Sequence, residues 1–464
     1  MTSQPPLPPE LWDKTPHDVR EAILTMVLAF ERRIAALEAR LGQDSSNSSR
    51  PPSSDGPQVK RGVPRPPSPR RRGGQKGHPR HQRVLLPADQ VVDHKPSRCE
   101  ACHLPLEGDD PEPLVDQVVD LPVVMRHVVH HRRHTLACSC GASTTAAAVP
   151  EAARGFGPRL QAAVAYLGGV GRLGKRPIRT LLSDLCGIPV ALGSVSRIEA
   201  RTSDALASVH DEALAHTRGL DANVDETSWR EGTKKAWLWT AVTKAATVFL
   251  IRKNRNRAAF DDLVGPNPGV LTTDRFSVDT HLAAAKRQVC WAHLCRDFQA
   301  MIDRKDAGST IGEDLLMHAT ILLDRWRKVR DGPRTRAWFH RKVRPWLEAE
   351  ISALLARGEG CGSRATARVC RALRTLGVSL WTFAQTPGLE PTNNAAERAL
   401  RHAVCWRKTS DGTASERGSR FVERMMTVVA TCRSQGRNIL EFLTQTITAH
   451  QDNTPKPPIL PAGA

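Results

Sequence analysis

Three acidic residues that lie far apart in the chain are the strongest candidates for chemistry: Asp225, Asp274 and Glu397. The first two follow strand-like runs, residues 220–224 and 269–273, and each is expected to end a strand. Glu397 lies in a basic, helix-forming stretch. Carboxylate oxygens are the ligands that hard cations prefer, and a pair of Mg²⁺ or Mn²⁺ ions can promote displacement at a phosphodiester. The three acids therefore predict a two-metal site that acts on nucleic acid.

The turn before Glu397 also allows a purely structural role. Asn394 is a good N-cap residue, and Glu397 follows it at the spacing of a capping box. Two neighbours of the acids have open roles as well. Glu226 is either an additional ligand or only a neighbour, and His293 either orients a water or caps a strand.

The composition predicts a polyanionic partner. The chain has 464 residues, enough for two or more domains, and 67 Lys and Arg against 48 Asp and Glu give it a net charge of +19. Nucleic acid is the partner expected first, although ribosomal and membrane-surface proteins share this charge. No apolar run approaches the ~20 residues that cross a bilayer, and the N-terminus lacks a signal-peptide pattern. We therefore expect a cytoplasmic protein that associates with the nucleoid through DNA.

The N-terminal part combines a helix with a basic arm. Residues 10–42 carry a heptad seam that predicts a coiled coil and a homo-oligomer, the alternative being a helix that docks on its own chain. The seam consists of Ile23, Val27, Phe30, Ile34, Leu37 and Leu41. Residues 43–83 form a disordered linker in which residues 60–83 hold nine basic side chains and no acid. Arg70, Arg71, Arg72 and Lys76 of this arm are predicted to contact DNA phosphates.

Two pairs of cysteines in residues 84–150 predict a zinc-binding module. Cys99 and Cys102 form a CxxC motif, and Cys138 and Cys140 form a CxC motif after two strand-like runs, residues 115–124 and 125–137. Four thiolates can close a structural zinc site, with no open position for catalysis. One of the nearby histidines can replace a cysteine in this set. These are His103, His130, His131 and His134.

The remaining chain is predicted to be α/β. Residues 151–217 are helical, and within them 177–201 has the pattern of a helix-turn-helix that could enter DNA. Periodicity then predicts a mixed sheet in 218–298, with strands at 237–242, 247–251, 270–274 and 288–291 after the run that leads to Asp225, and a helix at 256–263. A helical insertion in 299–389, a C-terminal part of the same domain in 390–448 and a disordered tail in 449–464 follow.

In the order of its motifs, the chain resembles the insertion-sequence-66 family of bacterial DDE transposases over nearly its whole length. The matching pieces include Ser45 to Asp55, Gly73 to His78, the cysteine pairs, Asp225-Glu226-Thr227, Cys290-Trp291-Ala292-His293, Thr392 to Arg398, and Arg407-Lys408. The resemblance implies a ribonuclease H-like fold in which Asp225, Asp274 and Glu397 form the catalytic triad. It also suggests that helper proteins from the same element take part. The family tends toward Asp-Gly-Tyr where this chain has Asp274-Arg275-Phe276, which leaves Asp279 as an alternative second acid.

The predicted function is therefore that of a transposase. It would cut the ends of its element in double-stranded DNA, free a 3′-hydroxyl and join it to target DNA by Mg²⁺-dependent phosphoryl transfer. Arg398, Arg401, Arg407 and Lys408 are the predicted phosphate contacts near the acids. Two alternatives stay open: a non-catalytic, zinc-containing DNA-binding protein, and a ribonuclease H-like nuclease without strand transfer.

Overall fold

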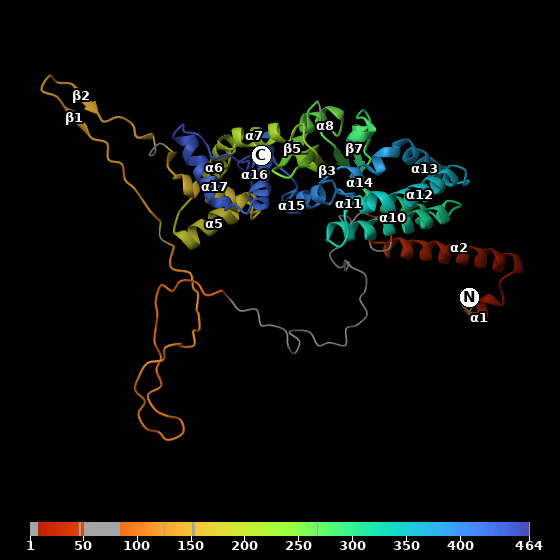
Figure 1. Ribbon diagram of the computed structural model, residues 1–464, viewed down its shortest axis with the longest axis horizontal. Helices are drawn as coiled ribbons and strands as arrows, with labels where there is room; N and C mark the ends of the chain where they lie inside the picture. Colours follow the sequence, from red (N-terminus) through yellow and green to blue (C-terminus); the bar gives the residue numbers. More distant parts are fainter. Residues whose placement is uncertain are drawn as a thin grey trace.

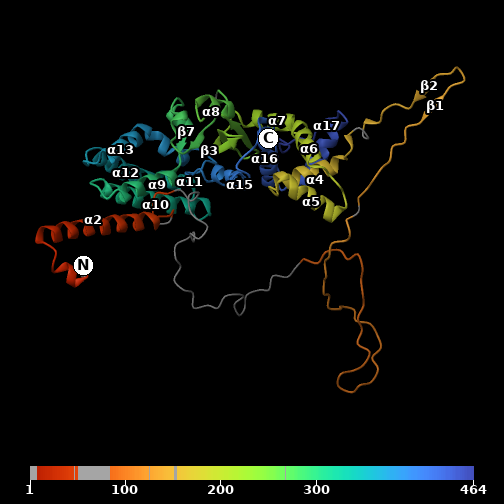
Figure 2. The same cartoon turned by 180° about the vertical axis from the view of Figure 1, so that it is seen from behind.

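A computed structural model describes residues 8–45, 48–50, 84–124, 126–150, 154–266 and 268–463. The helices and the main sheet from residue 158 onward form one continuous body (Figure 1). The N-terminal helices extend from one end of this body and residues 84–150 extend from the other, as the view from behind also shows (Figure 2). The basic arm with Arg70, Arg71, Arg72 and Lys76 lies outside the described residues.

The main sheet is mixed and has the strand order β5-β4-β3-β6-β7. Its strands are β3 (Ala222–Glu231), β4 (Lys234–Val242), β5 (Thr247–Arg252), β6 (Leu271–Thr273) and β7 (Arg287–Val289). The first three form an antiparallel meander, and β6 and β7 are parallel to β3 and to each other. The prediction of a mixed sheet with helices around it is confirmed.

The predicted end of the first strand is wrong. Asp225 lies inside β3, which continues to Glu231 and pairs with β4 from Asn223↔Val242 to Glu231↔Lys234. The polar residues after Asp225 have the composition of a turn. Their backbone N–H and C=O groups nevertheless bond to β4, and this pairing does not depend on the side chains. Gly232, with φ of 59°, closes the hairpin in the left-handed region that glycine adopts without strain.

The outer strand β5 is covered by α16 (Glu416–Ser434), whose side chains accept hydrogen bonds from its free N–H groups. The pairs are Thr247 N with Thr431 Oγ1, Phe249 N with Thr427 Oγ1, and Ile251 N with a carboxylate oxygen of Glu423. Four residues of a helix rise about 6 Å and two residues of a strand about 6.6 Å, so the two spacings match. The helix thereby removes the unpaired edge that would otherwise invite another strand.

Helices α4 (Pro158–Gly169), α5 (Lys175–Cys186), α6 (Leu192–Ala205) and α7 (Ala207–Thr217) precede the sheet, as predicted. They share a small apolar core built from Val164, Ile178, Leu182, Val190, Val195 and Ile198. Gly187 ends α5 with φ of 61°, and residues 187–191 connect it to α6. The helical pair is therefore confirmed, and its entry into DNA stays a prediction.

The predicted helical insertion is also present, between β7 and the helix that carries Glu397. It contains α9 (Trp291–Asp303), α10 (Ser309–Arg330), α11 (Arg336–Trp338), a π-helical turn (Phe339–Val343), α12 (Arg344–Glu359), α13 (Arg364–Leu376) and α14 (Thr382–Gln385). Its own core includes an aromatic cluster in which Trp326 packs edge-on against Phe339 and Phe383 at 5.2 and 4.8 Å between ring centroids. These aromatic side chains are structural.

The predicted disordered tail is wrong. Helix α17 (Ile439–Gln451) runs into it, and Ile459 beyond the helix is 0% exposed within the main core. The Lys456 ammonium donates to the carbonyl oxygen of Ala205, and Arg437 donates to that of Pro458. The proline-rich composition does not predict this packing, because an extended segment without regular secondary structure can still bury an isolated isoleucine and accept hydrogen bonds through its carbonyl groups.

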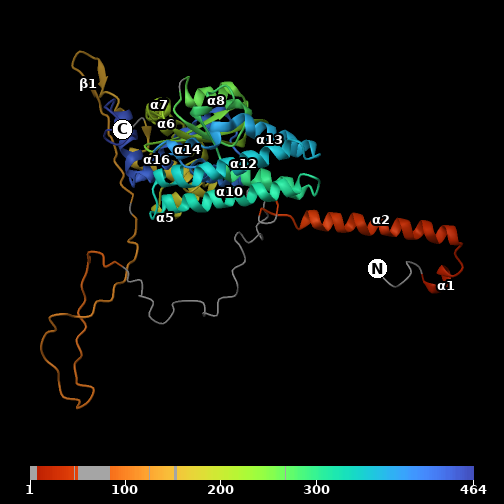
Figure 3. The ribbon, with the colours of Figure 1, turned by 45° about the vertical axis from the view of Figure 1, so that its right-hand side comes forward.

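The N-terminal helix α2 (His17–Leu41) follows the short α1 (Pro9–Trp12) and projects past the ends of α10 and α12 (Figure 3). Four residues of the predicted seam are exposed: Phe30 by 57%, Ile34 by 55%, Leu37 by 47% and Leu41 by 85%. The helix is confirmed. Pairing with a second copy stays a prediction.

Candidate active site

Asp225 and Asp274 lie at the same level on neighbouring parallel strands. Ala222 pairs with Leu271 and Asn223 with Thr272, an offset of 49 residues that also separates Asp225 from Asp274. Asp274 directly follows β6, as predicted, and its Oδ1 accepts a hydrogen bond from Phe276 N at 3.0 Å. The register therefore brings these two predicted acids to the same place on the sheet.

Glu397 is brought to this place by Asn393. Helix α15 (Asn394–Ser410) begins one residue later, and the buried Asn393 side chain donates to Val224 O on β3 at 2.7 Å. Asn223 Nδ2 donates to Asn393 Oδ1 at 3.1 Å, and the Cys290 sulfur accepts from Asn393 N at 3.1 Å. These bonds hold the start of α15 against β3, beside Asp225. Nothing in the sequence pointed to this role for Asn393, because asparagine is also a common helix N-cap residue.

The capping-box interpretation of Glu397 is wrong. Asn393, not Asn394, occupies the cap position, and its side chain makes no capping bond because it is bonded to β3 instead. Glu397 is the fourth helical residue rather than the third. Its carboxylate is about one-third exposed and faces His293 Nδ1 and the Arg296 guanidinium, each at 3.6 Å.

Asp225 and Glu226 feel the negative charges of neighbouring acids. Burial raises the pKa of Asp225 well above its ordinary value, and the negative charges of Glu226, Asp274 and Glu397 raise it further. Burial and the charge of Asp274 raise the pKa of Glu226 to about 7, against the opposing effect of its ion pair with Arg255. A group of neighbouring carboxylates that repel one another is typical of a site that binds a cation.

Carboxylates alone make up the donor set, and this chemistry suits Mg²⁺ or Mn²⁺. Within the described ranges, however, no three His, Cys, Asp or Glu side chains stand close enough to hold a metal ion as they are placed. The residues fit a divalent ion by type, burial and mutual repulsion. Glu226 differs from the others, because Arg255 already neutralises it and also stacks on the Phe276 ring at 3.7 Å.

Asp279 does not compete with Asp274 for the role of second acid. It is 0% exposed, its Oδ2 accepts from Thr273 Oγ1 at 2.5 Å, and its Oδ1 pairs with Arg287 at 2.6 Å. Both oxygens thus have partners within the fold. Asp279 holds the end of β6 in place.

His293 is a partly buried neighbour of Glu397. Burial lowers its pKa to about 4, the Arg296 charge adds to this effect, and Nδ1 has no hydrogen-bond partner among the described residues. The ring is therefore neutral at pH 7. Arg275, Arg296 and Asp297 also border the site, with Arg275 bonded to Asp297 at 2.6 Å. The sequence offered no periodic or motif signal for these three residues.

The predicted phosphate contacts on α15 differ in their solvent exposure and in their hydrogen bonds. Arg398, Arg401 and Lys408 are exposed. Arg407 is half-buried, and its guanidinium donates to Thr227 Oγ1 at 3.1 Å and to Ser228. Arg407 therefore attaches the end of α15 to β3, in addition to any contact with DNA.

The predicted zinc ligands lie in two separate turns. Cys99 N donates to Leu104 O in the first turn, and Cys138 N donates to Ala142 O at the tip of the hairpin of β1 (Thr135–Ala137) and β2 (Ser143–Thr145). Hydrogen bonds from the backbone of Cys102 and Cys140 lower the pKa of the Cys99 and Cys138 thiols, respectively. The described residues do not bring the two pairs into one metal-binding group. Of the predicted runs 115–124 and 125–137, only residues 135–137 form a strand in the described part.

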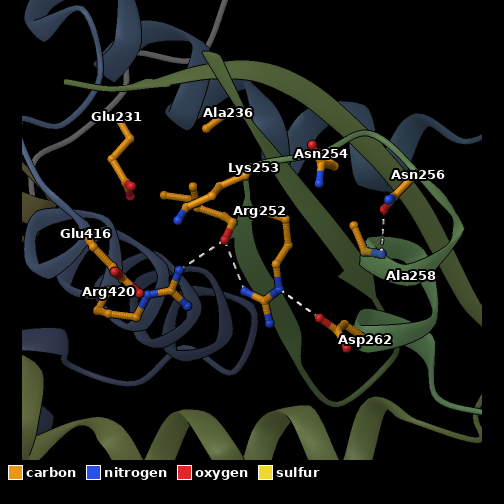
Figure 4. A pocket seen from close by; sticks show the side chains of 12 residues that line it. Glu231, Ala236, Arg252, Lys253, Asn254, Asn256, Ala258, Asp262, Glu416 and Arg420 are labelled. Atoms are coloured by element: carbon orange, nitrogen blue, oxygen red, sulfur yellow. Dashed lines mark hydrogen bonds and ion pairs between the residues drawn. The ribbon is translucent and has the colours of Figure 1, made fainter. Parts of the chain in front are cut away.

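A cavity of about 420 Å³ at the end of β5 contains none of the predicted acids (Figure 4). Arg252 and Arg420 both donate to the carbonyl oxygen of Ile251, at 3.1 Å each, and both pair with Glu423. Arg252 also pairs with Asp262 at 2.9 Å. The arginines of this cavity are thus used to close the end of the strand.

Comparison with known proteins adds a family and one relative. Residues 155–420, more than half of the chain and including all three acids, match the Transposase IS66 family. Residues 9–84 match a family of unknown function, DUF6444. A protein of Sinorhizobium fredii (strain NBRC 101917 / NGR234), "Uncharacterized protein y4qI", is 27% identical over 243 residues, which cover 47% of this chain and 44% of that protein. The match thus spans less than half of the relative.

Within the described ranges, no helix is long and apolar enough to cross a membrane.

Proposed function

Because the chain belongs to the IS66 family of transposases, we propose that it is a DDE-type DNA transposase. It cuts the ends of a bacterial insertion sequence and joins the freed 3′-hydroxyl to target DNA. The observations that support this most directly are the register of β3 with β6, which gives Asp225 and Asp274 equivalent positions, and the Asn393 bond that holds the start of α15, the helix of Glu397, against β3.

Asp225, Asp274 and Glu397 would hold two Mg²⁺ or Mn²⁺ ions, with Glu226 beside them. Such ions supply a stabilised attacking oxygen and a stabilised leaving oxygen for in-line phosphoryl transfer. The chain's own residues prepare the site. Asn393 fixes the distance between α15 and β3, and Arg255 neutralises Glu226, so that the remaining carboxylates carry the negative charge.

The sheet supports a ribonuclease H-like fold for this domain. An antiparallel meander of β3, β4 and β5, followed by β6 and β7 parallel to β3, gives the arrangement that such a fold implies. The helical block between β7 and α15 is then an insertion between the second and third acids.

The remaining parts would deliver DNA to the site. We propose that the basic arm with Arg70, Arg71, Arg72 and Lys76, together with Arg398 and Arg401, contacts DNA phosphates, and that α2 pairs with a second copy. Four thiolates, from Cys99, Cys102, Cys138 and Cys140, suit structural Zn²⁺ by type, and both pairs lie in turns whose amides stabilise a thiolate. The place of action would be the bacterial nucleoid, with accessory proteins of the same element.

The test is a DNA cleavage and strand-transfer assay with Mg²⁺ on a substrate that carries the element ends. Asp225→Asn, Asp274→Asn and Glu397→Gln should each abolish cutting and leave DNA binding intact. Glu313→Gln, at an exposed acid of α10 that is not among the site residues, is the matched control and should cut normally. Cutting that survives all three substitutions would reject the proposal. Cleavage without joined products would indicate a nuclease, and binding without cleavage by the unaltered chain would indicate a DNA-binding protein.

A further inference from the structure

A second cavity, of about 510 Å³, lies between the β3–β4 hairpin and the end of α15. Its lining includes four basic residues, Arg230, Lys235, Arg407 and Lys408, and one acid, Asp411. Of these, Arg230, Lys235 and Lys408 form no ion pair with any acid in the described part of the chain. The cavity therefore presents an excess of positive charge that no ion pair with an acid neutralises.

The cavity shown in Figure 4 provides a contrast within the same domain. It also contains three basic residues, Arg252, Lys253 and Arg420, but three acids line it too: Glu231, Asp262 and Glu416. Its two arginines are already paired with Glu423. Its charges cancel, so it has no preference for a polyanion. The cavity of Arg230 and Lys408 is the one whose charges are not balanced.

The same two elements carry both the acids and this cavity. On α15, Lys408 lies eleven residues after Glu397, and at about 1.5 Å per residue the separation along the helix is about 16 Å. On β3, Arg230 lies five residues after Asp225, which at about 3.3 Å per residue is also about 16 Å. Asn393 ties the two elements at the acidic end, and Arg407 ties them at the cavity end through Thr227 and Ser228. The distance from acids to cavity is therefore held fixed by the fold.

We propose that this cavity binds the DNA backbone about five base pairs from the phosphate that reacts at the acids. This inference rests on the proposed function for the position of the DNA, and on the unpaired charges for its binding. A span of about 16 Å corresponds to about five steps of 3.4 Å along a duplex strand. Exposed lysines and arginines contact phosphates without reading sequence, so the cavity sets the register of the DNA rather than its sequence.

The first experiment measures binding alone. Fluorescence anisotropy with a labelled duplex of arbitrary sequence gives the affinity of the full chain over a range of NaCl concentrations. Each lost phosphate contact should reduce the slope of log affinity against log salt by about 0.9. Lys235→Gln and Lys408→Gln should each show this reduction, and the double variant about twice as much. Lys253→Gln, in the balanced cavity, is the matched control and should leave the slope unchanged.

The binding experiment has clear contrary outcomes. An unchanged slope in both variants would overturn the inference, as would an equal loss in Lys253→Gln, because the effect would then reflect total charge rather than this cavity. All three lysines are exposed, so none of the substitutions should prevent folding. Because cleavage is not measured, the result stands whether or not the chain is a transposase.

The second experiment tests the position. Cleavage substrates are shortened stepwise on either side of the cut. Lys408→Gln should slow cleavage only while the duplex on one side extends beyond about five base pairs, and should have no effect on shorter substrates. An effect that persists on the shortest substrates would contradict the proposed distance. If the unaltered chain cuts no substrate, the proposed function fails, and the anisotropy result still decides whether the cavity binds DNA.

Discussion

Two acids of this chain, Glu423 and the proposed catalytic acid Asp225, differ in the charges that surround them. Glu423 on α16 is 1% exposed and Asp225 is partly buried, and burial is the largest cause of a raised pKa in both. Glu423 is surrounded by Arg252, Arg420 and a backbone N–H, whereas Asp225 is surrounded mainly by other acids. Burial alone therefore does not mark a functional carboxylate. The sign of the neighbouring charges is the feature that distinguishes these two acids.

The largest effect should follow from removing the charge of Asp225. Asp225→Asn should lower the rate of DNA cleavage by about 1,000-fold or more, since a metal ion contributes several kcal/mol of transition-state stabilisation. Its melting temperature should stay the same or rise, because a buried and repelled charge is lost. A rate constant from single-turnover cleavage and a thermal melt measure the two effects. If Asp225→Asn loses stability and keeps its cleavage activity, Asp225 has the structural role expected of Glu423.

The opposite pattern is expected for Glu423→Ala. This change leaves the Ile251 N–H without an acceptor and two arginines without their carboxylate, which should lower the free energy of unfolding by about 3–5 kcal/mol. Cleavage per folded molecule should be unchanged. Urea unfolding measures the stability, and Glu423→Gln, which keeps an acceptor for Ile251, is the control that should lose less.

The pH dependence of stability sharpens the comparison further. The pKa of Glu423 is raised to about 7 in the folded protein from an ordinary value of 4.5. A raised pKa favours the protonated acid in the folded state, so its contribution is fully present below about pH 4.5 and is lost as pH rises toward 7. Wild-type stability should thus fall relative to Glu423→Gln across this window by about 1–3 kcal/mol. A constant difference between the two unfolding curves across these pH values would show that Glu423 stays ionised throughout.

The smallest expected loss of stability follows from removing the Thr427 hydroxyl, which accepts a hydrogen bond from the middle of β5. Thr427→Val keeps the shape of the side chain but leaves the buried Phe249 N–H unpaired, which should cost about 1–2 kcal/mol of unfolding free energy. Thr427→Ser retains the acceptor and should lose less. Denaturant midpoints of the two variants compare them, and a larger loss in Thr427→Ser than in Thr427→Val would assign the effect to the methyl group instead.

Local patterns in the sequence were enough to predict most of the strands and helices and the family. Alternation of apolar residues predicted β4, β5, β6 and β7 within a few residues, and helical periodicity predicted the block between β7 and α15. These signals are carried by neighbouring residues, because side-chain direction repeats every 2 residues in a strand and every 3.6 in a helix. The motifs around Asp225 and Glu397 indicated the IS66 family, and the match of residues 155–420 confirms it.

Contacts between distant segments decided the rest. The length of β3 came from its pairing with β4, and the buried position of Ile459 came from a core built by other elements. Asn393 shows the limit most clearly. Its residue type suits a helix cap, and only the presence of β3 beside it turned its side chain toward Val224 and left the helix uncapped.

The identities of the acids, their order and the charge of the chain were thus set by the sequence itself. The position of the helix that carries Glu397 against β3 was set by the tertiary structure, because hydrogen bonds join residues such as Val224 and Asn393 that are 169 positions apart. Such bonds depend on the packed arrangement of a helix against a sheet. No periodicity within either segment encodes them.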